Sequence, residues 1–254
     1  MNDKVCEEID HTGDSTESCR FKQCLRNSDN PTVSICYYKN LGNKLAPIIF
    51  RRPDNLERIK FVVISQEPGV SVRTEFDSNI ERMKNYWCNL LKSEEKPKKS
   101  SPIYLMKEIF QNFDIYQNQV YWTHSLKCIP WETNDQIQQD WIFCAPYCSE
   151  RLKEELDALP DNDLVIITVG AYALTLVLNI VEGRSLCEPV KLKDYIVRDK
   201  IPIIKEIPYG HVSDNKPKKP KCVKIFPFYH PSAYGLPHEY QSIKEKMINT
   251  LKAE

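Results

Sequence analysis

Ten cysteines occur in this 254-residue chain, and four of them are spaced as a thiolate site would require. Cys19 and Cys24 form a close pair, and Cys128 and Cys144 follow much later in the chain. A loop pair and two distant cysteines can converge on one metal centre, either an iron–sulfur cluster or a zinc ion. Thiols stay reduced inside cells, so clustered cysteines in an intracellular chain indicate a metal site or catalysis rather than disulfides.

Two short polar motifs could carry further chemistry. One is SQEPG at residues 65–69, and the other is the tripeptide His230-Pro231-Ser232. Each comes directly after an apolar segment that is typical of a strand. The carboxyl ends of parallel strands form the ligand crevice of an open α/β sheet, so both motifs are expected at that edge.

The elements that must position these residues follow from the apolar pattern. Runs such as FVVIS and LVIITV indicate strands buried on both faces, and these two strands are expected at the sheet centre. Polar linkers and helical stretches between the strands predict a parallel sheet and a single α/β domain. Pro146 is expected to kink or split the longest helix. The predicted strands are 60–66, 119–125, 163–170 and 222–229, and the predicted helices are 103–112, 134–159 and 171–181.

Composition sets broader bounds. The 35 basic and 35 acidic residues balance, so any nucleic-acid binding must come from local patches. The charged stretches 92–101 and 213–221 read as solvated loops. No signal peptide or membrane span is evident, which predicts an intracellular protein in the cytoplasm or nucleus. We expect residues 1–18 to be a flexible segment and residues 19–254 to form one domain.

Taken together, the cysteines and motifs resemble the iron–sulfur branch of the uracil-DNA glycosylase superfamily. The stretch 123–130 (THSLKCIP) is similar to that branch's cysteine motif after the second strand, and Cys144 has the spacing of its next cysteine. The resemblance implies a three-layer α/β/α fold with a central four-stranded, mainly parallel sheet. It also implies a 4Fe-4S cluster on Cys19, Cys24, Cys128 and Cys144. The N-terminal pair has four intervening residues where the family has two, so Cys6 and Cys36 are alternative ligands.

The same resemblance implies roles for the motif residues. His230 would donate a hydrogen bond to uracil O2 as the base leaves, and Glu67 would hold the attacking water. Gln66 would line the base pocket through its backbone, although a second alignment of the motif gives Gln66 the acidic position instead. Phe76 is the nearest aromatic residue for stacking on the base. Ser232 and Tyr234 would contact the substrate, and Tyr234 and Leu236 are candidate wedges that fill the space left by a flipped base.

Two departures from the family pattern concern specificity. His124 stands where the family has a base-reading Asn, and an imidazole cannot reproduce the paired donor and acceptor of an amide. The aromatic stacking motif has no clear match after Gly69. The segment 169–173 (VGAYA) resembles the family's junction between the third strand and its helix, where Gly170 would permit close packing.

Three functional hypotheses follow. The first is a monofunctional DNA repair glycosylase, expected to be a monomer, that hydrolyses the N-glycosidic bond of uracil or a related deaminated base in DNA. No lysine nucleophile occupies a motif position, which disfavours an added lyase step. The second is a non-catalytic iron–sulfur protein of the same fold that binds nucleic acid or serves as an accessory protein. The third is a zinc-stabilised α/β protein unrelated to DNA.

Overall fold

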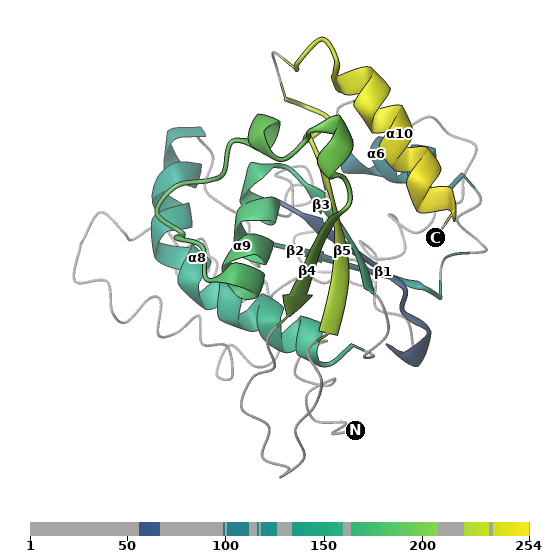
Figure 1. The fold of residues 1–254 in the computed structure, drawn as a ribbon. Helices are drawn as coiled ribbons and strands as arrows, with labels where there is room; N and C mark the ends of the chain where they lie inside the picture. The colour runs from purple at the N-terminus through teal and green to yellow at the C-terminus, as the bar shows by residue number, and fades with distance from the viewer. Residues whose placement is uncertain are drawn as a thin grey trace, which may run out of the picture.

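The computed structural model describes residues 56–66, 99, 101–111, 116, 118–125, 134–159, 164–207, 221–233 and 236–253. Within these residues a five-stranded sheet lies between two layers of helices (Figure 1). The expected three-layer α/β fold is therefore confirmed. The strands are β1 (Phe61–Ser65), β2 (Val120–His124), β3 (Leu164–Val169), β4 (Ile203–Ile207) and β5 (Lys221–Phe228).

The strand order in the sheet is β2-β1-β3-β5-β4. β1 pairs in parallel with β2 and β3, and β3 pairs in parallel with β5. β1 and β3, the two strands predicted at the centre, each have a strand on both sides, and every residue in them is buried. Their continuous apolar sequence follows from this position, because helices cover both faces of the sheet.

The sheet has one strand more than the expected four. β4 lies antiparallel to β5 at the edge, with Ile203 opposite Ile225 and Ile207 opposite Lys221. Ile204 in this strand is 64% exposed, and Lys205 pairs with Glu182 at 2.8 Å. A half-exposed edge strand lacks the continuous apolar run that marks a buried strand, which explains why sequence reasoning missed it.

Helices form the two outer layers (Figure 1). On one side α8 (Asn134–Asp157) packs on α9 (Ala171–Glu182), and on the other α10 (Tyr240–Ala253) packs on α6 (Pro102–Ile109). α6, α8 and α9 match the predicted helices, whereas α10 was not predicted. α8 is not divided at Pro146, whose side chain is exposed. None of the described helices combines the length and apolar character of a membrane-spanning segment.

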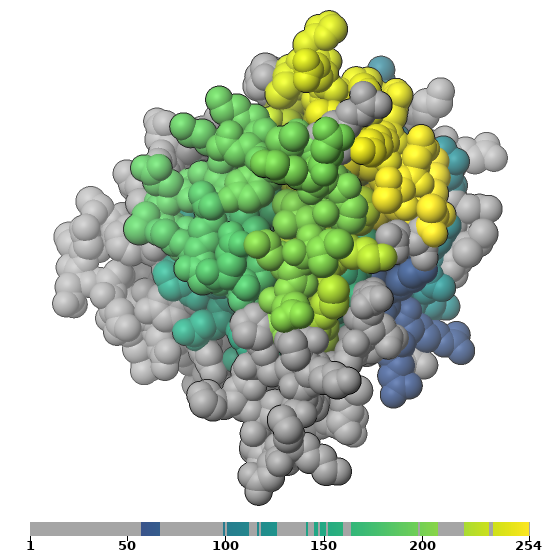
Figure 2. Space-filling model, in the orientation of Figure 1, coloured from purple at the N-terminus to yellow at the C-terminus, as the bar shows by residue number. Residues whose placement is uncertain are grey.

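Two short 3-10 helices, η3 (Leu192–Asp194) and η4 (Arg198–Lys200), precede β4. In Figure 1 they lie at the end of the sheet where β5 finishes. Figure 2 shows this green segment bordering the yellow residues that follow β5 on one face of the molecule. The carboxyl edge of the sheet is therefore flanked by the chain before β4 and by the chain after β5.

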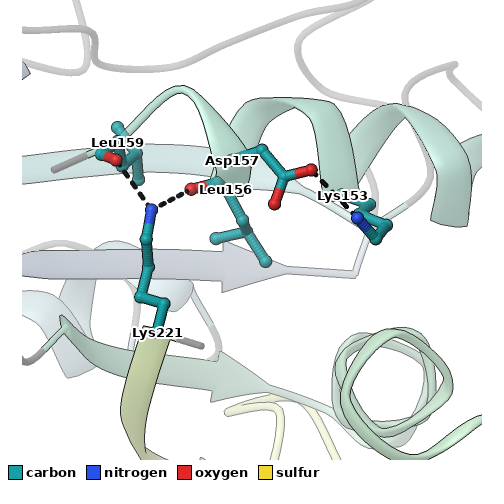
Figure 3. Close-up of polar contacts among 5 residues, drawn as sticks. All are labelled: Lys153, Leu156, Asp157, Leu159 and Lys221. Atoms are coloured by element: carbon teal, nitrogen blue, oxygen red, sulfur yellow. Dashed lines mark hydrogen bonds and ion pairs between the residues drawn. The ribbon is translucent and has the colours of Figure 1, made fainter. Parts of the chain in front are cut away.

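Lys221 corrects one expectation. The stretch 213–221 reads as a solvated loop, yet Lys221 begins β5 and is only 2% exposed. Its Nζ donates to Leu156 O at 2.8 Å and to Leu159 O at 2.7 Å (Figure 3). The last carbonyls of a helix have no partner within the helix, so a buried ammonium group can satisfy them. Lys221 thus ties the start of β5 to the carboxyl end of α8.

Candidate active site

Residues from three neighbouring strand ends meet at the carboxyl edge of the sheet. Gln66 follows β1, Gly170 follows β3 and His230 comes shortly after β5. A Cβ added to Gly170 would lie 3.1 Å from Gln66 Oε1 and 3.6 Å from His230 Cβ. Gln66 and His230 therefore both border Gly170, as expected if the two motifs share one site.

Gly170 has a local reason to be glycine. Its φ of 98° is a conformation that residues with a Cβ rarely adopt, and it precedes the first turn of α9. The tight space beside Gln66 adds a second reason, because even a methyl group there would press on the amide. The sequence predicts a packing role for Gly170, and the structure places this residue beside Gln66 and His230 in the candidate site.

β2 completes the row of strand ends. His124 pairs in register with Ser65, and Ser125 N donates to Ser65 O at 2.8 Å. Ser125 Oγ also donates to Gln66 O at 2.5 Å. The backbone of Gln66, expected to line the base pocket, is therefore engaged at its carbonyl by Ser125, and the Gln66 side chain is the group that lies against Gly170. The expectation did not include Ser125.

His124 lies beside the site but is fully buried, with 0% of its surface exposed. It shares a sheet face with Trp122, whose Nε1 donates to Ser65 Oγ at 3.1 Å. Ser65 Oγ in turn donates to Thr123 O at 3.4 Å, a long contact. By contrast, Gln66 and His230 are half-buried and keep some surface at the edge. His124 thus ends β2 as predicted and lies in a packed environment, and its base-reading role stays a prediction.

The ring of His230 has a defined hydrogen-bond arrangement. Nδ1 lies 2.6 Å from Ser232 Oγ, and the backbone N–H of Ser232 donates to the same nitrogen at 3.2 Å. A nitrogen that accepts from a backbone N–H carries no proton of its own, so the neutral ring has its proton on Nε2. Nε2–H is therefore the donor that His230 can offer to a ligand. Ser232 fixes this arrangement through its two contacts with Nδ1.

Burial lowers the pKa of His230 below its usual value of 6.5, because the apolar surroundings penalise the charged ring. At neutral pH the ring is therefore uncharged and keeps the Nε2–H tautomer. A neutral donor can stabilise an anion as it forms without holding a full positive charge in the site beforehand.

A carboxylate that the sequence did not indicate lies close to this region. The pKa of Tyr229, the residue before His230, is raised first by burial and second by the negative charge of Asp194 on η3. Asp194 is exposed and belongs to no recognisable motif. Only the fold, which returns the chain after α9 to the end of β5, brings Asp194 near this edge.

Several predicted site residues lie outside the described residues. They are Glu67, Phe76 and Tyr234 among the substrate and catalytic positions, and Cys19, Cys24 and Cys128 among the metal ligands. Cys144 lies on α8, where only its backbone is described. In the part of the chain that the structure describes, no three His, Cys, Asp or Glu side chains are grouped as a metal site would need. The cluster therefore stays a prediction.

Fold and site together define an α/β protein with polar side chains gathered at the carboxyl ends of neighbouring parallel strands, the place where open α/β sheets bind their ligands. Residues 56–252 match the Uracil DNA glycosylase superfamily, which is well over half of the chain, and the chain belongs to that superfamily. Membership supports a hydrolase of the DNA glycosylase type that acts on DNA. A comparison with curated proteins gave no match. The iron–sulfur branch within the superfamily remains a prediction.

Proposed function

We propose that this protein is a monofunctional DNA glycosylase of the iron–sulfur branch that removes uracil or a related deaminated base from DNA. The observation that carries the proposal is the convergence of Gln66, Gly170 and His230 at the carboxyl edge, in a chain of this superfamily. His230 there presents a neutral ring with Nε2–H available.

The proposed reaction breaks the bond between the base nitrogen and C1′ of the sugar. The bonding electrons pass to the base, and Nε2–H of His230 stabilises the resulting anion. The sugar becomes cation-like, and a water molecule adds to C1′. Glu67, next in sequence to Gln66, would position that water and take its proton. With no lysine proposed as nucleophile, the DNA backbone remains uncut.

Base recognition in this proposal falls to residues around the same edge. Phe76 would stack on the base, and Ser232 and Tyr234 would contact the substrate nearby. His124 stands where the family has the Asn that recognises uracil. We therefore propose that this protein discriminates less sharply between bases. The 4Fe-4S cluster would hold the segment after β2 to α8 through Cys128 and Cys144, and it takes no part in the reaction as proposed.

The direct test uses purified full-length protein and oligonucleotides that carry one uracil, hypoxanthine or xanthine, each single-stranded and double-stranded. Excision leaves an abasic site that alkali converts into a strand break, which a denaturing gel resolves. An oligonucleotide with thymine at the same position is the matched control. Strand breaks with at least one deaminated base and none with thymine would support the proposal, whereas no product from any substrate would contradict it.

A second candidate function is a non-catalytic DNA-binding protein of the same fold. The full burial of His124 favours it, because a base-reading side chain needs access to the base. Under this alternative, the same oligonucleotides would bind in a gel-shift assay without giving product.

The titration of His230 gives a pH prediction. Burial lowers its pKa, so its NMR titration midpoint is expected below 6.5, and base excision should not fall as the pH is lowered from 8 to 6.5. Between 6.5 and the lowered pKa the unfolded chain binds more protons than the folded one, so the free energy of unfolding decreases as pH falls through that window. A midpoint above 6.5 would show that a nearby charge, rather than burial, controls the ring.

Iron content tests the predicted cluster. The wild-type protein, purified without oxygen, is expected to be brown and to contain about four irons per chain. Cys144→Ser should lose that iron, because Cys144 is a predicted thiolate ligand. The matched control is Cys187→Ser, which changes an exposed cysteine in the chain after α9 and should keep its iron. Stoichiometric zinc in colourless wild-type protein would instead establish the zinc alternative.

A further inference from the structure

The end of β5 depends on a contact from outside the sheet. Phe228 O accepts from Gly170 N at 2.8 Å, so the carbonyl of Phe228 points toward β3. Successive residues of a strand direct their N–H groups to opposite edges, so the N–H of Tyr229 faces the β4 side. β4 starts at Ile203, opposite Ile225, and therefore does not extend that far. On the same edge Pro227 has no N–H to satisfy, whereas Tyr229 does.

Tyr240 supplies the acceptor that the sheet lacks there. Its Oη accepts the N–H of Tyr229 at 3.1 Å, and the two rings pack edge to face with centroids 4.7 Å apart. Tyr240 is 6% exposed and begins α10. The chain thus leaves β5 at Tyr229 and returns to the same point at Tyr240. Between the two tyrosines lie His230 and Ser232, so one contact closes the loop that carries the proposed leaving-group donor.

The helix behind Tyr240 is well anchored. Met247, Ile248 and Leu251 of α10 are buried, and Lys244 Nζ lies 2.6 Å from Glu108 Oε2 on α6. Tyr240 N also donates to Pro237 O at 2.9 Å, which fixes the turn into the helix. The loop is therefore attached to a helix that packs against the rest of the fold.

We propose that Tyr240 is a positioning residue for catalysis: its hydroxyl holds the backbone of Tyr229 and thereby sets the place of the neighbouring His230 ring at the carboxyl edge of the sheet. This inference rests on the proposed glycosylase function. In the proposed reaction, Tyr240 touches neither the substrate nor the reacting atoms. Burial raises the pKa of Tyr240 above its usual range, so the hydroxyl remains protonated and uncharged at all working pH values.

The test removes one oxygen atom with Tyr240→Phe. The ring contact with Tyr229 is kept, but the oxygen that accepts the Tyr229 N–H is lost. The backbone at the end of β5 is then held less firmly. We expect kcat for base excision to fall about tenfold, because small displacements of a catalytic group are costly. KM should change less than about twofold, because the substrate-contacting groups are unchanged.

Tyr116→Phe is the matched control. It also removes one phenol hydroxyl from a half-buried tyrosine, and its ring contacts with Phe61 and Phe110 would persist. Tyr116 lies near the amino end of β2, away from the carboxyl strand ends that carry His230. Its carbonyl accepts from the N–H of Gln119, the residue before β2. This variant should keep the wild-type kcat.

A spectroscopic readout separates positioning from general loosening of the fold. In protein with ¹⁵N-labelled histidine, the ring shifts of His230 report which nitrogen carries the proton, with His230→Ala used for assignment. We expect Nε2–H alone in wild type and Tyr116→Phe, and a mixture with the Nδ1–H tautomer in Tyr240→Phe. An unchanged tautomer or an unchanged kcat in Tyr240→Phe would overturn the inference. If wild type excises no base, the proposed function fails, and the tautomer comparison alone then decides whether Tyr240 positions the His230 ring.

Discussion

Replacing His230 by alanine is expected to lower the rate of base excision about 100- to 1000-fold, the range seen when one preorganised donor to a developing anion is removed. The donor is defined by geometry, because Ser232 N–H and Oγ occupy Nδ1 and leave Nε2–H free. The ring is also neutral before reaction, since burial lowers its pKa. The rate should be measured in single-turnover reactions on a uracil oligonucleotide, so that product release does not limit it.

His238→Ala is the control for this prediction. His238 is an exposed histidine before α10, in the same loop that follows β5, and its loss should leave the excision rate within about twofold of wild type. An equal rate for wild type and His230→Ala would show that His230 is only a turn residue after β5. The thermal unfolding of both variants should be recorded, so that a reduced rate is assigned to chemistry in folded protein.

The second large effect concerns stability. Lys221→Met is expected to lower the free energy of unfolding by at least about 3 kcal/mol, because two buried hydrogen bonds from a charged group are lost and each typically contributes about 1.5–3 kcal/mol. Methionine fills a similar volume, but it leaves the carbonyls of Leu156 and Leu159 without the ammonium group that they contact. The loss also removes a cation from the negative end of the α8 dipole. Urea unfolding followed by circular dichroism measures the change.

Lys205→Met is the control, since Lys205 also lies on a strand and contacts Glu182, but with a side chain that is 36% exposed. A surface pair of this kind contributes about 1 kcal/mol or less, so this variant should unfold close to wild type. If both lysine variants lost the same small amount, the link between β5 and α8 would have no special role in stability.

Much of the architecture was accessible from the sequence. The apolar runs of β1 and β3 are buried on both faces, so their composition alone identifies them as central strands. Parallel strands place their carboxyl ends at one edge, and this rule predicted that Gln66 and His230 would lie near each other. Short-range patterns that repeat along one element are therefore sufficient for the core of the sheet and for the location of the site.

Long-range contacts were not accessible in this way. Lys221 ends a stretch of lysines and prolines that looks solvated, and its burial depends on where the carboxyl end of α8 lies after the chain folds. β4 carries exposed residues, and its identity as a strand comes from pairing with β5 rather than from its own pattern.

The same distinction applies within the site. Sequence identified His230 and Ser232 as a motif, but the protonated nitrogen follows from the distances between Ser232 and the ring. The position of Asp194 near Tyr229 and the contact of Tyr240 with the end of β5 join segments that are remote in sequence or carry no motif. Sequence by itself determined the four core strands, three of the helices and the end of the sheet where the candidate site lies, because those follow from local apolar periodicity. Tertiary structure decided which side chains are buried and which partners set their protonation, because both depend on atoms that only folding brings together.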